Sequence, residues 1–286
     1  MVRPGAKCWV NSASGQRDGD WGAVRRAPLW LYLPAAMGVA VVLLPLVAIV
    51  VKTPWRHFWL DITTDSSRAA LELSLRTAAF STLGCLVVGV PMAIVFARSN
   101  SRWMRVIRAL VLLPLVLPPV VGGLALLYAF GKQGLAGKPL HAWGIDIAFS
   151  TTAVVLAQLF VSLPFVVITV ESALRTVGDR YDRVAATLGA APERTLTRVT
   201  LPLIGPAVLA GTVLAFARSM GEFGATITFA GNLPGVTQTA PLAIYVQQID
   251  DPAQALPMSV VLMVVALVVV VAVHSRETTR RRSLVL

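Results

Sequence analysis

Residues Thr152–Val170 read TAVVLAQLFVSLPFVVITV, a run of apolar and small side chains without a charged residue. At about 1.5 Å of rise per residue, a helix of this length nearly crosses the ~30 Å hydrocarbon layer of a bilayer. Comparable runs occupy Leu29–Val51, Thr77–Ala97 and Ile107–Phe130. These segments alone predict four transmembrane helices.

Two more spans follow later in the chain. One begins at Leu203 and carries two charged residues near its far end, and the other covers Leu256–Val273. The segment Phe223–Val246 between them contains GNLPG at positions 231–235, an irregular stretch whose backbone lipid cannot hydrogen-bond. We interpret it as a re-entrant or external connection. The predicted fold is an all-α polytopic membrane protein with six transmembrane helices.

The composition agrees with this fold class. Of the 286 residues, 56% are hydrophobic and only 14% are charged, which excludes an ordinary soluble domain. The net charge of +11 comes from Lys and Arg before residue 29, in the second and fourth connections between spans, and after the last span. Because cytoplasmic loops are rich in Lys and Arg, both termini are predicted to be cytoplasmic. Anionic lipid accounts for this charge without nucleic acid as a partner.

This arrangement of six spans with cytoplasmic termini divides the chain into three parts. Residues 1–28 are predicted to be a flexible basic cytoplasmic tail, residues 29–275 a transmembrane domain with a long cytoplasmic loop at 171–202, and residues 276–286 a second basic cytoplasmic tail. The two cysteines, Cys8 and Cys85, are predicted to be free thiols, because one lies in the polar tail and the other in an apolar run.

The long loop contains a pattern typical of two short helices. Residues 179–190 read DRYDRVAATLGA, which predicts a helix that ends at Gly189. One side of this helix is predicted to be apolar and to contain Tyr181, Val184, Ala185 and Leu188. A second helical stretch, Glu193–Val199, leads to Pro202 at the entry to the fifth span. The apolar side of the first helix needs cover, either from another protein or from the membrane surface.

The spacing in this loop resembles a known family. Ala185-Ala186 and Gly189, followed after nine residues by Val199-x-Leu201-Pro202, is similar to the "EAA" loop of bacterial binding-protein-dependent ABC importer permeases. In that family the loop is a coupling helix that sits in a cleft of a separate ATPase subunit. The resemblance implies that the coupling residues here are Asp182, Arg183, Val184, Ala185, Ala186, Leu188, Gly189, Ala190, Val199, Leu201 and Pro202.

This loop departs from the family pattern at its start. The Glu and the first Ala of the family pattern fall on Arg183 and Val184, and Asp182 is the candidate replacement for that Glu. The chain itself has no phosphate-binding loop, since the nearest approach, GLAGKP at 134–139, has the wrong spacing and lacks the hydroxyl that would bind magnesium. We therefore predict a transport subunit with no catalytic, cofactor-binding or metal-binding residues, with ATP and Mg bound by the partner ATPase.

The fifth span carries the candidate pathway. Arg218 and Glu222 stand four residues apart, so a continuing helix would place them on the same side. Ionisable residues inside a membrane are functional candidates, although a pair can also brace the bundle. Small and hydroxyl residues surround them. The predicted pathway or gate residues are Pro118, Pro119, Arg218, Ser219, Gly221, Glu222, Gly224 and Thr226.

Two further stretches of sequence resemble one group within this family. FARSMGEFGAT at 216–226, continued by FAGNLPG at 229–235, and LLPLVLPPVVGG at 112–123 resemble the molybdate and sulfate permeases of this family, the molybdate permease most closely. The resemblance implies a type I importer architecture in the bacterial cell membrane, a homodimer, two ATP-binding cassette subunits and an external oxyanion-binding protein. The implied substrate is a tetrahedral oxyanion, most closely molybdate, with tungstate, sulfate or thiosulfate as alternatives.

A gradient-driven secondary transporter is the alternative of another class. Such a protein is expected to carry carboxylates or histidines within several spans as proton or sodium sites. In the predicted spans only Glu222 is of this kind. The pattern therefore favours an importer driven by ATP.

Overall fold

The computed structural model describes residues 28–99, 101–178 and 180–283, so Cys8 and all but the last residue of the predicted tail at 1–28 lie outside the described residues. The described residues form helices and connections, without a strand. They divide into two units, Met1–Val51 and Lys52–Leu286. The smaller unit contains η2 (Leu29–Leu31) and α1 (Tyr32–Lys52), an apolar helix long enough to cross a membrane.

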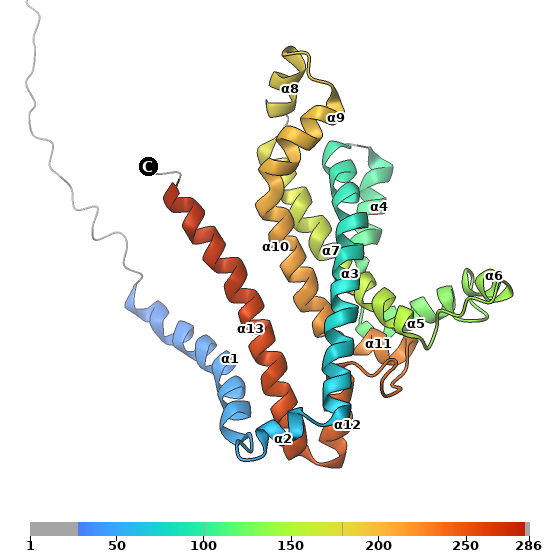
Figure 1. Ribbon diagram of the computed structural model, residues 1–286. Coiled ribbons are helices and arrows are strands. Elements are labelled where there is room, and N and C mark those ends of the chain that lie inside the picture. Colours follow the sequence, from blue (N-terminus) through green and yellow to red (C-terminus); the bar gives the residue numbers. More distant parts are fainter. Residues whose placement is uncertain (1–27, 100, 179, 284–286) are drawn as a thin grey trace, which may run out of the picture. The chain divides into compact units, whose positions relative to one another are not determined.

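Three long helices form the centre of the larger unit: α3 (Asp65–Arg98), α7 (Thr151–Val177) and α10 (Leu201–Met220) (Figure 1). They pack closely because small residues lie where they meet. A Cβ built on Gly211 of α10 would lie 3.3 Å from the Cα of Val166 in α7. A Cβ built on Gly89 of α3 would lie 3.1 Å from the side chain of Leu163 and 3.2 Å from that of Val166. Each of the three helices contains one of the predicted spans.

The third predicted span is not one continuous helix. Ile107–Phe130 divides into α4 (Arg102–Leu112), η3 (Leu113–Leu115) and α5 (Pro119–Phe130), and the two arms are bent by 117°. The prolines explain the bend, because Pro114, Pro118 and Pro119 each lack a backbone donor and disfavour helix in the residue before them. α6 (Gly137–Ala142) follows α5.

The connection over Phe223–Val246 is broken, as predicted. It contains α11 (Gly224–Phe229) and the start of α12 (Ala240–Asp250), with an irregular stretch between them in which Gly231 and Gly235 have φ values of +76° and +74°. Only glycine takes this left-handed conformation at little cost. A helix spanning the membrane is therefore absent from this segment.

The last helix, α13 (Pro252–Ser283), is longer than the predicted sixth span. The helix continues beyond residue 275, so the predicted tail at 276–286 is helical up to Ser283, and its last three residues lie outside the described part. In the described residues five helices are long and apolar enough to cross a membrane, or six if α4 and α5 form one broken span. The predicted count of six corresponds to the second case.

The two ends of the larger unit differ. At one end lie α8 (Arg180–Thr187), α9 (Pro192–Thr195), the end of α3 and the start of α4, and at the other lie α2 (Phe58–Ile62) and α12 (Figure 1). α13 runs from the α2 end toward the α8 end. The basic connections around residues 100 and 180 thus lie at one end, as the threading requires, and their placement in the cytoplasm stays a prediction.

Candidate functional site

α8 has the helical form and the end that were predicted. It ends at Thr187, and Gly189 follows with a φ of +75°. The amides of Leu188, Gly189 and Ala190 donate to the carbonyls of Val184, Ala186 and Ala185, which closes the last turn. Glycine at this position lets the chain reverse toward α9.

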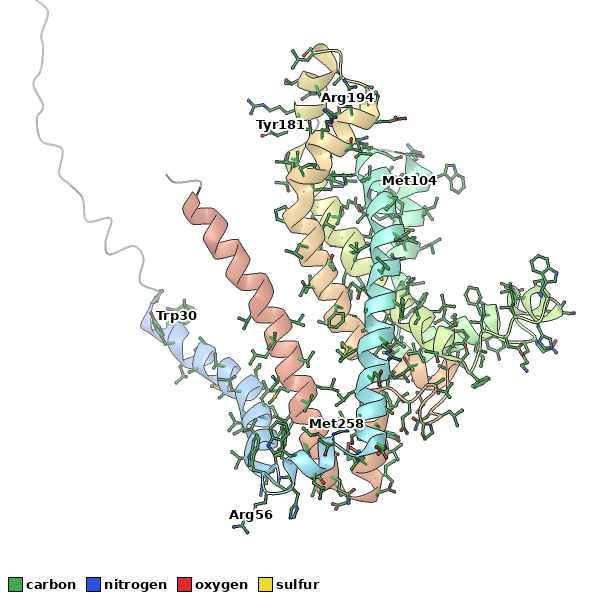
Figure 2. The ribbon with its side chains drawn as sticks, viewed as in Figure 1. Trp30, Arg56, Met104, Tyr181, Arg194 and Met258 are labelled. Atoms are coloured by element: carbon green, nitrogen blue, oxygen red, sulfur yellow. The ribbon has the colours of Figure 1, made fainter. Side chains whose placement is uncertain are left out.

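The outer side of α8 is exposed. Tyr181, Val184 and Leu188 have 48%, 54% and 82% of their surface accessible, and none of the residues of α8 is buried. Figure 2 shows Tyr181 and Arg194 on the segment that projects beyond the long helices. Ala185, four residues after Tyr181 and so near it on the helix, is half-buried. Tyr181 also lines a small cavity with Leu174 and Val177 of α7, so Val184 and Leu188 are the two apolar residues left open.

Asp182 attaches α8 to the rest of the protein. Its Oδ2 lies 2.9 Å from a terminal guanidinium nitrogen of Arg98 at the end of α3, and its Oδ1 accepts a hydrogen bond of 3.1 Å from Thr200. This carboxylate, the candidate replacement for the Glu of the family pattern, is thus already paired within its own chain.

The second half of the loop is continuous with the fifth span. α9 runs into η4 (Leu196–Thr200), a π-helix that contains Val199, and then into α10, which starts at Leu201 rather than at the predicted Leu203. The amide of Leu201 donates to Leu196, five residues back. Pro202, in the first turn of α10, has no amide hydrogen to donate back to η4. π-helical turns of this kind are frequent at functional sites.

Arg218 and Glu222 form the predicted pair, but in a different way. The helix does not continue as far as Glu222, because α10 ends at Met220 and Gly221 caps it. The chain still returns Glu222 to Arg218, and a guanidinium nitrogen lies 2.6 Å from its Oε2. The other oxygen, Oε1, accepts a hydrogen bond of 2.7 Å from the amide of Ala225. Glu222 is only 1% exposed, and a buried carboxylate needs a partner of opposite charge, which Arg218 supplies.

The structure brings two other predicted pathway residues together. A Cβ built on Gly224 would lie 2.6 Å from the Cβ of Pro119, so the start of α11 packs directly on the start of α5. Thr226, in α11, is fully buried, and its hydroxyl oxygen has no hydrogen-bond partner among the described residues. Pro118 and Gly221 are exposed.

Ser219 lies apart from these residues. Its hydroxyl is 3.2 Å from that of Ser81 in α3 and 2.9 Å from that of Ser162 in α7. All three serines are fully buried. Ser219 therefore joins α10 to α3 and α7, and its place on the pathway stays a prediction.

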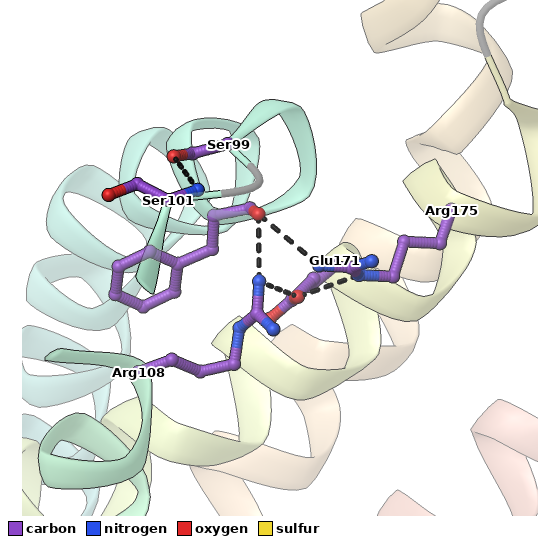
Figure 3. Close-up of polar contacts among 6 residues, drawn as sticks. Ser99, Ser101, Arg108, Glu171 and Arg175 are labelled. Atoms are coloured by element: carbon purple, nitrogen blue, oxygen red, sulfur yellow. Dashed lines mark hydrogen bonds and ion pairs between the residues drawn. The ribbon is translucent and has the colours of Figure 1, made fainter. Parts of the chain in front are cut away.

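One cluster of charges was missed by sequence reasoning. The carboxylate of Glu171 in α7 lies 2.8 Å from Arg108 of α4 and 2.8 Å from Arg175, one turn further along α7 (Figure 3). Both arginines also donate to the carbonyl of Phe96 in α3, at 2.8 and 3.4 Å. The spacing of Glu171 and Arg175 was a visible signal, because residues four apart on a helix face the same side. The third partner, Arg108, had no such signal.

These features define a class of protein: a polytopic helical membrane subunit with a projecting helical loop at one end and buried ion pairs among its spans. Residues 89–277 match the family model described as binding-protein-dependent transport system inner membrane component, so this chain belongs to that family.

The relatives agree with this assignment. The chain is 60% identical over 249 residues to the molybdenum transport system permease protein ModB of Mycobacterium tuberculosis, covering 87% of this chain and 94% of that protein. It is 36% identical over 227 residues to the sulfate transport system permease protein CysT of Escherichia coli, covering 78% and 82%.

A solved structure shows the same fold. A chain of the bacterial alginate ABC transporter, in complex with its alginate pentasaccharide-bound periplasmic protein, matches with a TM-score of 0.66 over 85% of this chain and 92% of that one. The identity is 17%. This chain is therefore a multi-pass membrane protein with the fold of ABC transporter permeases.

Proposed function

We propose that this chain is the membrane-spanning permease subunit of an ATP-driven molybdate importer. The single observation that carries the substrate is the 60% identity to a molybdenum permease over 87% of the chain, against 36% to a sulfate permease. Tungstate shares the charge and tetrahedral shape of molybdate, so the same complex would accept both. Sulfate and thiosulfate are the less favoured alternatives.

The exposed side of α8 supports a separate ATPase as partner. Tyr181, Val184 and Leu188 present a contiguous apolar surface on a segment that projects beyond the long helices. A short helix that lays its apolar side in a groove of another protein is a recurrent mode of recognition. In this proposal ATP and Mg bind to the partner, two such partners serve a homodimer of this chain, and an external protein delivers the oxyanion.

The contact between α5 and α11 is the proposed gate of the pathway. Pro119 lies against Gly224, and the buried pair of Arg218 and Glu222 holds the chain just before α11. Movement of α5 away from α11 would separate these elements and admit water to Thr226, whose hydroxyl lacks a partner in the closed arrangement.

A transporter driven by an ion gradient has less support. Such a mechanism needs carboxylates that can take up a proton or a sodium ion inside the membrane. The long helices bring a second buried carboxylate, Glu171, into consideration beside Glu222, and each is paired with arginine. Each carboxylate thus already has a fixed cationic partner within the described part of the chain.

Reconstitution tests the proposal. The chain is assembled in proteoliposomes with the ATPase subunit, and hydrolysis is measured with binding protein loaded with molybdate, tungstate or sulfate. Stimulation by molybdate and tungstate is expected. Stimulation by sulfate alone would move the assignment to sulfate, and failure of any ATPase subunit to associate would overturn the importer assignment.

A further inference from the structure

Two sets of polar contacts, joined by the last turn of α3, lead from α8 into the membrane helices. The first begins at Asp182 of α8, which is paired with Arg98 in the last turn of α3. Two residues before Arg98, the carbonyl of Phe96 accepts from Arg108 and Arg175. Both arginines also contact Glu171. Elements far apart in the sequence are thus joined by charged side chains at one end of the bundle (Figure 3).

The last turn of α3 explains why two arginines gather there. The final carbonyls of a helix have no intrahelical partner, and the C-terminal end of a helix carries partial negative charge. Arg108 and Arg175 satisfy the Phe96 carbonyl and lie in that field. The guanidinium of Arg108 also lies 5.7 Å from the centre of the Phe96 ring. Two cations at one buried carbonyl would repel each other without an anion between them.

Glu171 is that anion. Its side chain is 9% exposed, and its Oε1 is shared between Arg108 and Arg175. Because the three charged groups come from α4 and α7 and converge on α3, removal of the carboxylate would loosen all three helices at this end.

The cluster also lies between α8 and the proposed gate. Arg108 belongs to α4, and the proline-rich turn after α4 leads directly to α5, where Pro119 packs on Gly224. A displacement of α8 would act on α3 through Asp182 and Arg98. The Glu171 cluster would then pass it to α4, and so to α5.

We propose that Glu171 is a positioning residue for coupling, which makes α3, α4 and α7 move as one body when the ATPase displaces α8. This inference rests on the proposed function. It assigns to Glu171 no part in binding the ATPase or the anion. Its loss should therefore separate ATP hydrolysis from transport.

The test compares Glu171→Gln with the unchanged chain in the full reconstituted complex, with both molybdate uptake and ATP hydrolysis measured. Substitutions between coupled sites change the coupling by factors from about twofold to thirtyfold. We expect molybdate transported per ATP hydrolysed to fall within that range, while the ATPase subunit stays associated and hydrolysis continues. Arg108→Met, which removes the charge and both contacts of Arg108 but leaves Arg175 on the carboxylate, should lower the ratio less.

Glu72→Gln is the matched control, because Glu72 and Arg76 form an ion pair of the same four-residue spacing on the exposed surface of α3. It should leave the ratio unchanged. A second variant, Asp182→Asn, breaks the half-exposed pair with Arg98 without emptying the buried cluster. If both pairs act in one chain of contacts, the effects of Asp182→Asn and Glu171→Gln on the ratio will not add.

The outcomes separate the two proposals. If the unchanged chain neither binds nor stimulates an ATPase, the proposed function fails. If the unchanged chain couples and Glu171→Gln transports the same amount per ATP, or loses uptake and hydrolysis in equal proportion, only the role of Glu171 is overturned. If Glu171→Gln does not assemble, an unchanged ratio in both Arg108→Met and Asp182→Asn overturns it.

Discussion

Gly224 lies against Pro119 with no room for a side chain: a Cβ at position 224 would lie 2.6 Å from the Cβ of the proline. The contact joins the start of α11 to the start of α5, and the two residues are 105 positions apart in the sequence. It depends on the bend between α4 and α5, because a straight third span would carry Pro119 away from α11.

Gly224→Ala is expected to push α5 and α11 apart. Overpacking of a closely packed contact typically costs about 1–3 kcal/mol, and we expect that loss in the thermal unfolding of the purified protein, together with reduced molybdate uptake. The control is Gly205→Ala in α10, where an added Cβ meets no heavy atom within 4 Å. Equal stability of the two variants would show that the α5–α11 contact yields easily.

Gly189→Val should disturb the end of α8. Gly189 has a φ of +75° and open space around its Cα, so the penalty comes from the backbone alone, about 1–2 kcal/mol for a side-chain-bearing residue. Asn tolerates this conformation better, so Gly189→Asn is the matched comparison. We expect weaker association with the ATPase for Val than for Asn in a pull-down assay. Equal association would contradict a role for the left-handed turn.

Ser219→Ala should destabilise the bundle more than Ser81→Ala or Ser162→Ala. The hydroxyl of Ser219 contacts both other hydroxyls, so its removal breaks two hydrogen bonds where each of the others breaks one. Hydrogen bonds between membrane helices contribute about 0.5–2 kcal/mol each. Thermal unfolding in detergent measures the order, and an equal loss in all three variants would show that the serines do not act as a chain.

Glu222→Gln should leave Arg218 without its ion-pair partner. Breaking a buried pair by removing one member costs about 3–5 kcal/mol, because the remaining charge is uncompensated. The double variant Arg218→Leu with Glu222→Gln should recover part of the lost stability, since it removes that charge as well. Thermal unfolding of both variants checks this. A double variant less stable than Glu222→Gln would contradict the charge argument.

Much of the fold could be predicted because the deciding signals are local. The apolar runs locate α1, α3, α7, α10 and α13, and Gly189 correctly predicts the end of α8. The direction of the bend after Pro118 could not be predicted, because proline shows where a helix breaks but not where the next one points.

The contacts between distant residues were beyond sequence reasoning. Arg108 lies 63 positions from Glu171 in the chain, and only the packing of α4 on α7 brings them to 2.8 Å. Ser219 was predicted to lie on the pathway because its neighbours are small and polar, and only the structure shows that its hydroxyl meets those of α3 and α7. Helix phase and long-range pairing are set by tertiary packing, which a single sequence does not display.

Photo-crosslinking from α8 tests the coupling proposal most directly. A photoreactive amino acid is placed at Leu188, 82% exposed directly after α8, or at Leu135, 92% exposed between α5 and α6, in the chain assembled with its ATPase subunit. A crosslink to the ATPase from position 188 and none from position 135 is predicted. A complex that assembles but gives no crosslink from position 188 would contradict docking through α8.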